Sequence, residues 1–487
     1  MPMCSLHAST MIFLLYWIFS SIHLCASDNR LVPGKPLSPG STIISDDGTF
    51  ALGFFSPSNP KKHYYVGIWY NNIPKFTVVW VANRAAPITV PSSAVFTLTR
   101  SSNLTLSDGN GHVLWTTMAK SRISISSPRN TKNISTEAML DNTGNLILRS
   151  LADNAIIWQS FDHPTDTLLP GMNLRLSHNT HPLQRLISWK DIRDPSPGPF
   201  SYGADPNNLL QRFIWHGSVP HRRSPVWNNY LLIGKYMNNL NSTIYMAINH
   251  DSDEVYMSFG MPTGPFSVLI RMKITYLGKV NMLGWQSNIS AWTTLYSEPV
   301  HDCNIYGYCG PNSYCDNTDA VPACKCLDGF EPREEERRTN NRSFLLGCRR
   351  RKALRCHHGN SFLTYPSMKV PDNFIYIHKR SFDECMVECR SNCSCVAYAY
   401  SNISSGIIDD TRCLLWTGEL IDMEKVTQGG ENLYIRANRL NGMSSCFSSS
   451  ANCLPSYRHF SILPSPSERG LLIVGKEESI WPSFLNN

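Results

Sequence analysis

The chain has 487 residues, of which 17 % are charged and 11 % are aromatic, and it contains 31 prolines and 29 glycines. This length predicts three or four domains, and the composition favours short strands and turns over long helices. The net charge of +7 is modest, and no stripe of Lys and Arg alternates with aromatic residues, so nucleic-acid binding is not expected.

Residues 1–27 are predicted to be a secretory signal peptide. The apolar run from Met11 to Cys25 is short for a membrane span and precedes the small residues Ala26 and Ser27. A buried core helix is the alternative interpretation. No later apolar run is long enough to cross a bilayer, so we expect a secreted, extracellular protein, or a plasma-membrane protein if a longer isoform supplies the span.

Seven Asn-x-Ser/Thr sequons agree with an extracellular destination and predict a glycosylated surface. The predicted glycosylation sites are Asn103, Asn133, Asn241, Asn288, Asn341, Asn392 and Asn402.

A weak internal repeat follows the signal peptide. Three segments end in two apolar residues and a tryptophan, at Trp80, Trp115 and Trp158. Two of them follow a short strand pattern and a turn rich in Asp, Asn and Gly, which is typical of a hairpin. A unit used three times, each supplying one tryptophan to a common axis, predicts an all-β prism. An irregular sandwich with coincidental tryptophans is the alternative.

Several motifs here resemble a known family. The segments Asp46–Pro57, Tyr65–Tyr70, Val78–Arg84 and Leu140–Leu148 resemble the bulb-type, mannose-binding lectin domain of plant S-domain (G-type lectin) receptor kinases. The segments Trp158–Leu174 and Ser188–Asp205 resemble the S-locus glycoprotein region of the same family. The resemblance implies a mainly β chain, with a β-prism lectin domain and a second lectin-like β domain after about residue 160.

Sugar binding has to be argued from the site and not from the fold. The mannose site of bulb-type lectins is a strand with the pattern Gln-x-Asp-x-Asn-x-Val-x-Tyr, whose alternation puts five side chains on one face. The best match here consists of Asp141, Thr143, Asn145, Ile147 and Arg149. It keeps the Asn and an aliphatic residue but replaces the Gln, Asp and Tyr. We therefore interpret it as a degenerate carbohydrate site on a retained fold, with active mannose binding as the alternative.

Twelve of the sixteen cysteines lie between Cys303 and Cys413, in two sets of six. In an extracellular chain this density is typical of small disulfide-stapled modules, and a zinc site is the alternative because several of the cysteines are closely spaced.

The first set has the cysteine order of an EGF-like module. That resemblance implies the pairs Cys303–Cys315, Cys309–Cys324 and Cys326–Cys348. Calcium-binding versions need a cluster of carboxylates before the first cysteine. Only Glu298 and Asp302 are present there, so we expect no calcium.

The second set resembles a PAN/apple module. Residues 381–402 have the pattern of a helix that turns into a strand, with Cys385 and Cys389 on one helix face. The resemblance implies the pairs Cys385–Cys413 and Cys389–Cys395, and it leaves Cys356 with Cys393.

The predicted domain organisation follows from these segments. It consists of a signal peptide (1–27), a bulb-type lectin domain (28–157), an S-locus glycoprotein region (158–298), an EGF-like module (299–350), a PAN/apple module (351–440) and a Ser/Pro-rich tail interpreted as disordered (441–487). In that tail, Cys446 and Cys453 are near enough to pair with each other, or one of them links to another chain.

Enzymatic motifs are missing from the sequence, including those of protein kinases, P-loop proteins and zinc proteases, so no enzyme and no cofactor are expected. The segment from Asp162 to Asp166 mixes acidic residues with a histidine but is interpreted as a turn. The basic run Arg349–Lys352 is interpreted as a solvated loop, with a role in binding an acidic partner as the alternative.

The predicted function is recognition at the plant cell surface, in the apoplast, as in the recognition of pollen. The expected ligand is a peptide or protein, with a glycan as a further option, and homo- or hetero-dimers of receptors would form through the lectin or PAN surfaces. The alternatives are an active mannose-type lectin and a truncated product of a membrane-anchored serine/threonine receptor kinase.

Overall fold

The computed structural model describes residues 29–58, 62–117, 135–176, 183–205, 208–226, 231–232, 244–250, 255–260, 269–318, 321–333, 346–354, 361–402, 411–427 and 430–438. The predicted signal peptide and the Ser/Pro-rich tail lie outside these residues. Among the described residues, no helix has both the length and the apolar character that crossing a bilayer would require.

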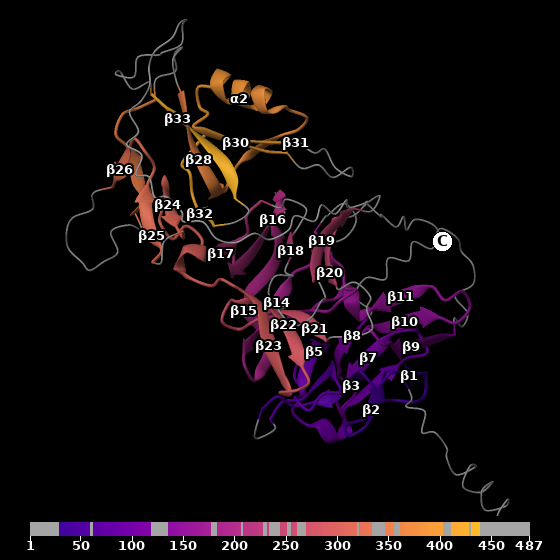
Figure 1. Ribbon diagram of the computed structural model, residues 1–487. Helices are drawn as coiled ribbons and strands as arrows, with labels where there is room; N and C mark the ends of the chain where they lie inside the picture. The colour runs from indigo at the N-terminus through magenta and orange to yellow at the C-terminus, as the bar shows by residue number, and fades with distance from the viewer. Residues whose placement is uncertain are drawn as a thin grey trace, which may run out of the picture. The chain divides into compact units, whose positions relative to one another are not determined.

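Three antiparallel sheets form the N-terminal part of the described chain (Figure 1). In spatial order, they contain β2 (Thr42–Ile44), β3 (Phe50–Phe55), β4 (Tyr65–Tyr70) and β5 (Thr77–Val81); β6 (Val95–Leu98), β7 (Leu104–Ser107) and β8 (Val113–Thr116); and β1 (Arg30–Leu31), β9 (Thr136–Leu140), β10 (Leu146–Ser150) and β11 (Ile156–Gln159).

One tryptophan from the last strand of each sheet meets the other two between the sheets. The ring centroid of Trp80 is 6.0 Å from that of Trp115 and 6.0 Å from that of Trp158, and the remaining pair is 5.8 Å apart. All three pairs are edge-to-face, which brings the positive edge of one ring to the negative face of the next. The predicted prism with a shared tryptophan axis is therefore confirmed, and the irregular sandwich is wrong.

A second set of three sheets repeats the same connectivity. They contain β14 (Leu186–Asp191), β15 (Asp194–Asp205), β16 (Asn208–His216) and β17 (Val219–Arg223); β13 (Leu174–Arg175), β20 (Val255–Gly260), β19 (Tyr245–His250) and β18 (Leu231–Leu232); and β12 (Thr167–Leu168), β21 (Ile270–Ile274), β22 (Val280–Gln286) and β23 (Ala291–Glu298).

The order in which the strands join these sheets shows the repetition. The short strand β12 pairs with β21, as β1 pairs with β9 in the first prism. Next, β13 pairs with β20, where the first prism has a bridge between Leu37 and Phe96. A four-stranded meander then follows in both. This topology agrees with the predicted second lectin-like β domain.

The two prisms share one continuous apolar core and are also joined by specific polar contacts. The Trp292 indole Nε1 donates to Thr77 Oγ1 at 3.0 Å. The Arg84 guanidinium donates to the carbonyl oxygens of Ser188 and Pro195 at 2.6 and 2.7 Å. The boundary expected between residues 157 and 158 divides β11, whose tryptophan completes the first prism's axis, so the first prism extends to Gln159.

The cysteine-rich part contains one eight-stranded sheet and one two-stranded sheet. The larger sheet has the order β25 (Ala323–Cys326), β24 (Ser313–Asp316), β32 (Met423–Lys425), β28 (Ser361–Lys369), β33 (Glu431–Ala437), β30 (Ala397–Asn402), β31 (Thr411–Trp416) and β29 (Ile375–Ile377), and the smaller sheet pairs β26 (Phe330–Pro332) with β27 (Cys348–Arg350). The hairpin of the EGF-like segment therefore extends the sheet of the PAN segment, because β24 pairs in parallel with β32.

The helix α2 (Phe382–Ser391) lies beside β30 in Figure 1. It begins with a capping box, in which Ser381 Oγ accepts from the Glu384 amide and the Glu384 carboxylate accepts from the Ser381 amide. Cys385 and Cys389 lie on its buried face, as predicted. The expected transition from helix to strand is confirmed, because β30 follows six residues after the helix ends.

Candidate ligand-binding site

The predicted sugar-binding strand lies at the hairpin between β9 and β10. Asp141 stands in the turn, where its Oδ1 accepts hydrogen bonds from the amide and hydroxyl of Thr143 and from the amide of Asn145, at 2.7 to 2.9 Å. Asp47 and Asp108 hold the turns of the other two sheets in a similar way. Asp141 therefore serves as a turn-capping residue.

Asn145 is buried, and its side chain points into the protein. Its Nδ2 donates to Gln159 Oε1 at 2.9 Å, and its Oδ1 accepts from the Ser160 hydroxyl at 3.1 Å and from the Phe161 amide at 3.2 Å. This side chain joins β10 to the end of β11 and has no polar atom turned toward solvent. The residue that best preserves the mannose pattern therefore uses its polar groups in hydrogen bonds within the protein.

Ile147 and Arg149 share the outer face of β10. The Arg149 guanidinium donates to Glu137 Oε1 at 2.6 and 2.9 Å. Glu137, a buried residue on β9, also accepts from Arg30 on β1 at 3.0 Å. The structure therefore does not bring the five predicted residues together on one open face. Asp141 and Thr143 belong to a turn, Asn145 is buried, and Arg149, which shares a face with Ile147, is paired across the sheet.

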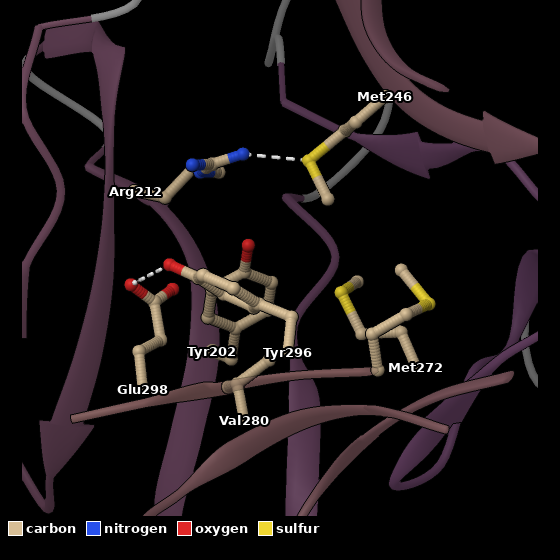
Figure 2. Close-up of a pocket in the computed structure, with 8 residues that line it drawn as sticks. Tyr202, Arg212, Met246, Met272, Val280, Tyr296 and Glu298 are labelled. Carbon is tan, nitrogen blue, oxygen red and sulfur yellow. Dashed lines mark hydrogen bonds between the residues drawn. The ribbon is translucent and has the colours of Figure 1, made fainter. Parts of the chain in front are cut away.

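The second prism contains a small cavity where its three sheets meet (Figure 2). Three methionines and two tyrosines line most of it, namely Met246, Met272, Met282, Tyr202 and Tyr296, together with Val280, Arg212 and Glu298. The cavity volume is about 10 Å³, which is near the minimum for one water molecule. It is too small for a sugar or a peptide side chain.

Charged groups beside this cavity are paired with one another. Arg222 lies 3.0 Å from Glu298, whose carboxylate also accepts from the Tyr296 hydroxyl at 3.0 Å. Burial alone would raise the pKa of Glu298, but Arg222 and Arg212 hold the pKa below its usual value. The Glu298 carboxylate is therefore paired within the core of the second prism.

A second buried ionic group joins the second prism to the PAN segment. Arg223 donates from Nε to Asp422 Oδ2 at 2.8 Å and from Nη2 to the Val370 carbonyl at 2.8 Å. Lys369 Nζ lies 2.8 Å from the same carboxylate oxygen. The exposed fractions of these side chains are 0, 3 and 1 % for Arg223, Asp422 and Lys369. These three residues were not among the sequence predictions.

Five disulfides join pairs of described cysteines, and the pairs are those that the family resemblance implied. They are Cys303–Cys315, Cys309–Cys324, Cys326–Cys348, Cys385–Cys413 and Cys389–Cys395. Cys393 is also disulfide-bonded, and its expected partner Cys356 lies outside the described residues.

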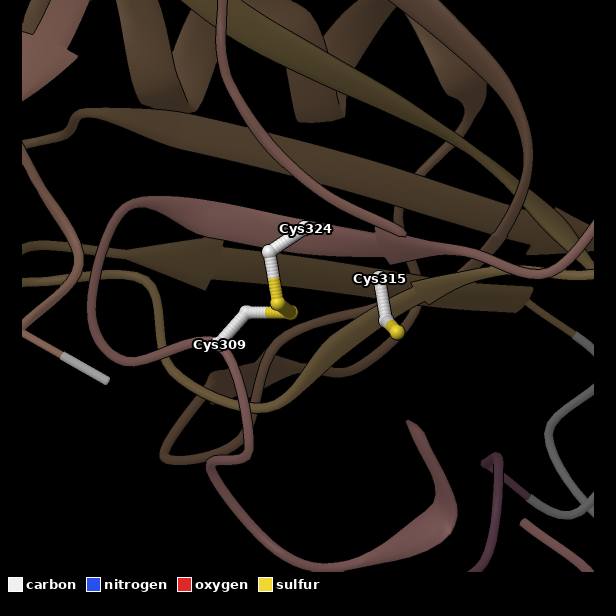
Figure 3. A group of neighbouring side chains, drawn as sticks. All are labelled: Cys309, Cys315 and Cys324. Carbon is white, nitrogen blue, oxygen red and sulfur yellow. A yellow bond between two sulfur atoms is a disulfide. The ribbon is translucent and has the colours of Figure 1, made fainter. Parts of the chain in front are cut away.

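Three sulfur atoms come together in the EGF-like segment. The sulfurs of Cys309, Cys315 and Cys324 lie within 4.8 Å of one another, as Figure 3 shows. Cys309 is bonded to Cys324, and Cys315 is bonded to Cys303, so none of the three offers a thiolate to a metal ion. Of the closely spaced cysteines that suggested zinc, Cys324 and Cys326 are bonded to Cys309 and Cys348, and Cys389 is bonded to Cys395.

Three predicted glycosylation sites have described side chains. Asn288 and Asn392 are exposed, and Asn103 is half-buried with its Nδ2 donating to the Ser101 carbonyl at 3.0 Å. Asn402 ends β30, and nothing is described of its side chain. Asn133, Asn241 and Asn341 lie outside the described residues.

The acidic and basic residues between Asp162 and Asp166 have structural contacts. The ring of His163 stacks on Trp158, with centroids 5.3 Å apart. Asp166 is buried and lies 3.0 Å from Lys273 Nζ. The two side chains therefore support the junction between the prisms, in agreement with the turn interpretation.

Three protein-family models match the chain. They are the D-mannose binding lectin over residues 77–190, the S-locus glycoprotein domain over residues 222–334 and the PAN-like domain over residues 356–423. The S-locus-specific glycoprotein S6 of Brassica oleracea is 35 % identical over 406 residues, which cover 82 % of this chain and 89 % of that protein. The chain belongs to the plant S-domain family.

Longer members of the family are also similar. The G-type lectin S-receptor-like serine/threonine-protein kinase B120 of Arabidopsis thaliana is 34 % identical over 440 residues, which cover 87 % of this chain and 49 % of the kinase. The chain thus spans about half the length of this relative, and none of the three matching family models is a kinase domain.

A solved structure of monomeric mannose-binding lectins from Gastrodia elata is 18 % identical and covers 27 % of this chain and 96 % of that chain. Its TM-score of 0.20 is too low to support an argument about the site.

Proposed function

We propose that this S-domain chain is a secreted, glycosylated recognition protein of the plant cell surface whose ligand is a peptide or protein, as in the recognition of pollen. The observation that supports this most directly is the state of the degenerate carbohydrate strand. The polar groups of Asp141, Asn145 and Arg149 are bonded within the protein. A sugar would have to break these contacts before it could use them, at a cost of roughly 1–3 kcal/mol for each buried group left without a partner.

Protein recognition also agrees with how the parts are joined. The two prisms share a core, and the ionic group around Asp422 connects the second prism to the PAN segment. Such connections hold extended surfaces in a fixed arrangement, which lowers the ordering cost of binding a large partner.

A binding experiment separates the classes of ligand. The secreted protein, with its disulfides and glycans intact, is immobilised, and extracellular fluid is applied after treatment with either protease or periodate. We expect protease to abolish binding and periodate, which oxidises sugar diols, to leave it intact. Binding that periodate abolishes and protease leaves intact would favour an active mannose-type lectin. This is the second candidate function, because the chain matches the D-mannose binding lectin model.

The remaining alternative is a product of a gene for a membrane-anchored receptor kinase. The kinase relatives motivate it, because the chain matches only about half of their length. Sequencing of longer transcripts tests it, since a downstream span and kinase in the same reading frame would support it and their absence would remove it.

A further inference from the structure

Two arginines and one carboxylate meet on the outer face of the sheet that carries the degenerate sugar strand. Glu137 on β9 and Arg149 on β10 are directly opposite each other and alternate with core residues, so their side chains point away from the core. Arg149 donates from Nη2 and Nε to Glu137 Oε1 at 2.6 and 2.9 Å, and Arg30 on β1 donates from Nη1 to Glu137 Oε2 at 3.0 Å. One carboxylate therefore holds both guanidiniums in place.

This group has one positive charge in excess, because two guanidiniums share one carboxylate. The excess charge lies at the surface, since the side chains of Arg30 and Arg149 are 48 and 27 % exposed, whereas that of Glu137 is 5 % exposed. A guanidinium has five N–H donors, and the bonds from Arg149 to Glu137 use two of them. The arrangement therefore presents oriented cationic donors to solvent above a covered carboxylate.

Apolar side chains flank the two arginines on the same face. Met139 is paired with Arg30 on one side and with Ile147 on the other, which makes one row across three strands. In the next row, Arg149 is paired with Ile156 on β11, whose exposed fraction is 56 %. Met139 and Ile147 are half-buried. Because side chains that are opposite each other in a sheet lie on the same face, a ligand can contact cationic and apolar groups here at once.

The basic run Arg349–Lys352, which the sequence offered as a site for an acidic partner, has a different arrangement. It is not a simple solvated loop, because Arg349 and Arg350 belong to β27. Arg349 lies 3.0 Å from Glu331, and the guanidinium carbon of Arg350 lies 4.4 Å from the centre of the Phe330 ring. Since the two arginines are neighbours in a strand, their charges point to opposite faces. The face around Arg30 and Arg149 is therefore the stronger candidate.

We propose that Arg30 and Arg149 form an anion-binding site that receives a carboxylate side chain of an acidic peptide ligand, with an adjacent apolar residue of the peptide on Met139 and Ile147. A carboxylate complements the excess positive charge and accepts charge-assisted hydrogen bonds from a guanidinium. It does not have to break the bonds to Glu137, and a neutral sugar is not favoured by the charge. The proposal rests on the peptide-recognition function and names the chemistry of its ligand.

The test uses the full secreted chain and the peptide Leu-Glu-Leu-Glu-Leu with an uncharged fluorophore, followed by fluorescence anisotropy. Arg149→Gln is expected to weaken binding about tenfold or more, because charge-assisted hydrogen bonds are lost. Arg100→Gln removes the same charge from an exposed turn of the same prism and is the matched control, for which we expect a change below about twofold. Arg149→Lys keeps the charge without the planar fork and is expected to bind with intermediate affinity.

Glu137→Gln separates a binding role from a folding role. It removes the negative charge that competes with the ligand, so we expect the peptide to bind about threefold tighter or more. A role in stability alone predicts weaker binding in both Arg149→Gln and Glu137→Gln, so weaker binding in Glu137→Gln would overturn the proposal. If thermal unfolding shows that Arg149→Gln does not fold, Arg149→Lys and Glu137→Gln still decide.

The charge of the ligand is tested separately. Equal affinity for Leu-Gln-Leu-Gln-Leu, or equal loss in Arg100→Gln and Arg149→Gln, would overturn anion recognition at this site. Tighter binding of trigalacturonate than of the acidic peptide, with the same dependence on Arg149, would overturn the peptide assignment in favour of an acidic sugar.

Failure of this site and failure of the proposed function are separable. If protease-sensitive binding from extracellular fluid persists unchanged in Arg149→Gln, the anion site is wrong and peptide recognition stands. If no protease-sensitive ligand exists, peptide recognition is wrong, whatever the acidic peptide does.

Discussion

Replacement of Asp422 by Asn tests how the second prism and the PAN segment are held together. The change keeps the side-chain shape but removes the negative charge that Arg223 and Lys369 share at 2.8 Å each. Arg223 and Lys369 would both remain buried without the carboxylate that they share. Breaking a buried ion pair in this way typically costs about 3–5 kcal/mol, and we expect Asp422→Asn to lose an amount in that range.

Native-state hydrogen exchange is the appropriate assay, because a multidomain chain need not unfold in one step. The amides of β17 and β32 lie on either side of the ionic group, and their opening free energy should fall together. Glu331→Gln is the control. This change breaks the ion pair with Arg349. Because the side chain of Arg349 is 58 % exposed and that of Glu331 is 38 % exposed, the change should lower the opening free energy by less than about 1 kcal/mol.

A double variant sharpens the result. Lys369→Met in the Asp422→Asn background removes one of the two uncompensated cations, so part of the lost stability should return. A loss of less than about 1 kcal/mol in Asp422→Asn, or no recovery in the double variant, would show that the ionic group does not hold the junction.

The remaining predictions concern stability and pH. Trp158→Ala should lower the unfolding free energy by about 3 kcal/mol, because it empties one third of the axis; a loss below about 1 kcal/mol, measured by denaturant titration, would contradict this. Asn145→Ala should cost about 1–3 kcal/mol by leaving Gln159 and Ser160 without their partner, and an unchanged midpoint would show that Asn145 has no structural role. Although burial raises the pKa of Asp422, Lys369 and Arg223 lower it below 3.8 in the folded state. The contribution of Asp422 to stability is therefore complete above pH 3.8 and is lost as the pH falls through the pKa of the folded state. The unfolding free energy should consequently fall less steeply with acid in Asp422→Asn than in the unchanged chain. Identical dependence of the unfolding free energy on pH in the two proteins would contradict this role of Asp422.

The sequence was sufficient for the architecture of the first prism. Trp80, Trp115 and Trp158 recur after similar hairpins, and a pattern that is repeated three times constrains the fold far more than any one strand does. The second prism was harder to predict, because the residues that line its central cavity are mainly methionines and tyrosines and show no repeated sequence signature. Only the family resemblance indicated it.

The candidate sugar site shows a different limit. Alternation predicted that Asp141 to Arg149 would share one face, but the first residues of this segment belong to a turn. Asn145 stands just before β10 and turns inward to Gln159. Side-chain periodicity holds only within a regular strand, so the spacing of residues could not predict where the side chains of the turn residues point.

Long-range charge pairs were equally inaccessible. Arg223 and Asp422 are 199 residues apart in the chain, and no local pattern connects them. The same applies to the pairing of β24 with β32, which joins the two cysteine modules into one sheet. Each module was predicted from its own cysteines, but the sheet they share depends on tertiary contacts.

Titration calorimetry of an α-linked mannotriose into the secreted, glycosylated chain measures whether the degenerate strand still binds mannose. If the polar atoms of the degenerate strand are committed to the fold, no saturable heat should appear up to about 1 mM sugar, a limit that corresponds to roughly −4 kcal/mol of binding free energy. Saturable binding well below that concentration, abolished by Asn145→Ala in a variant that still folds, would contradict it.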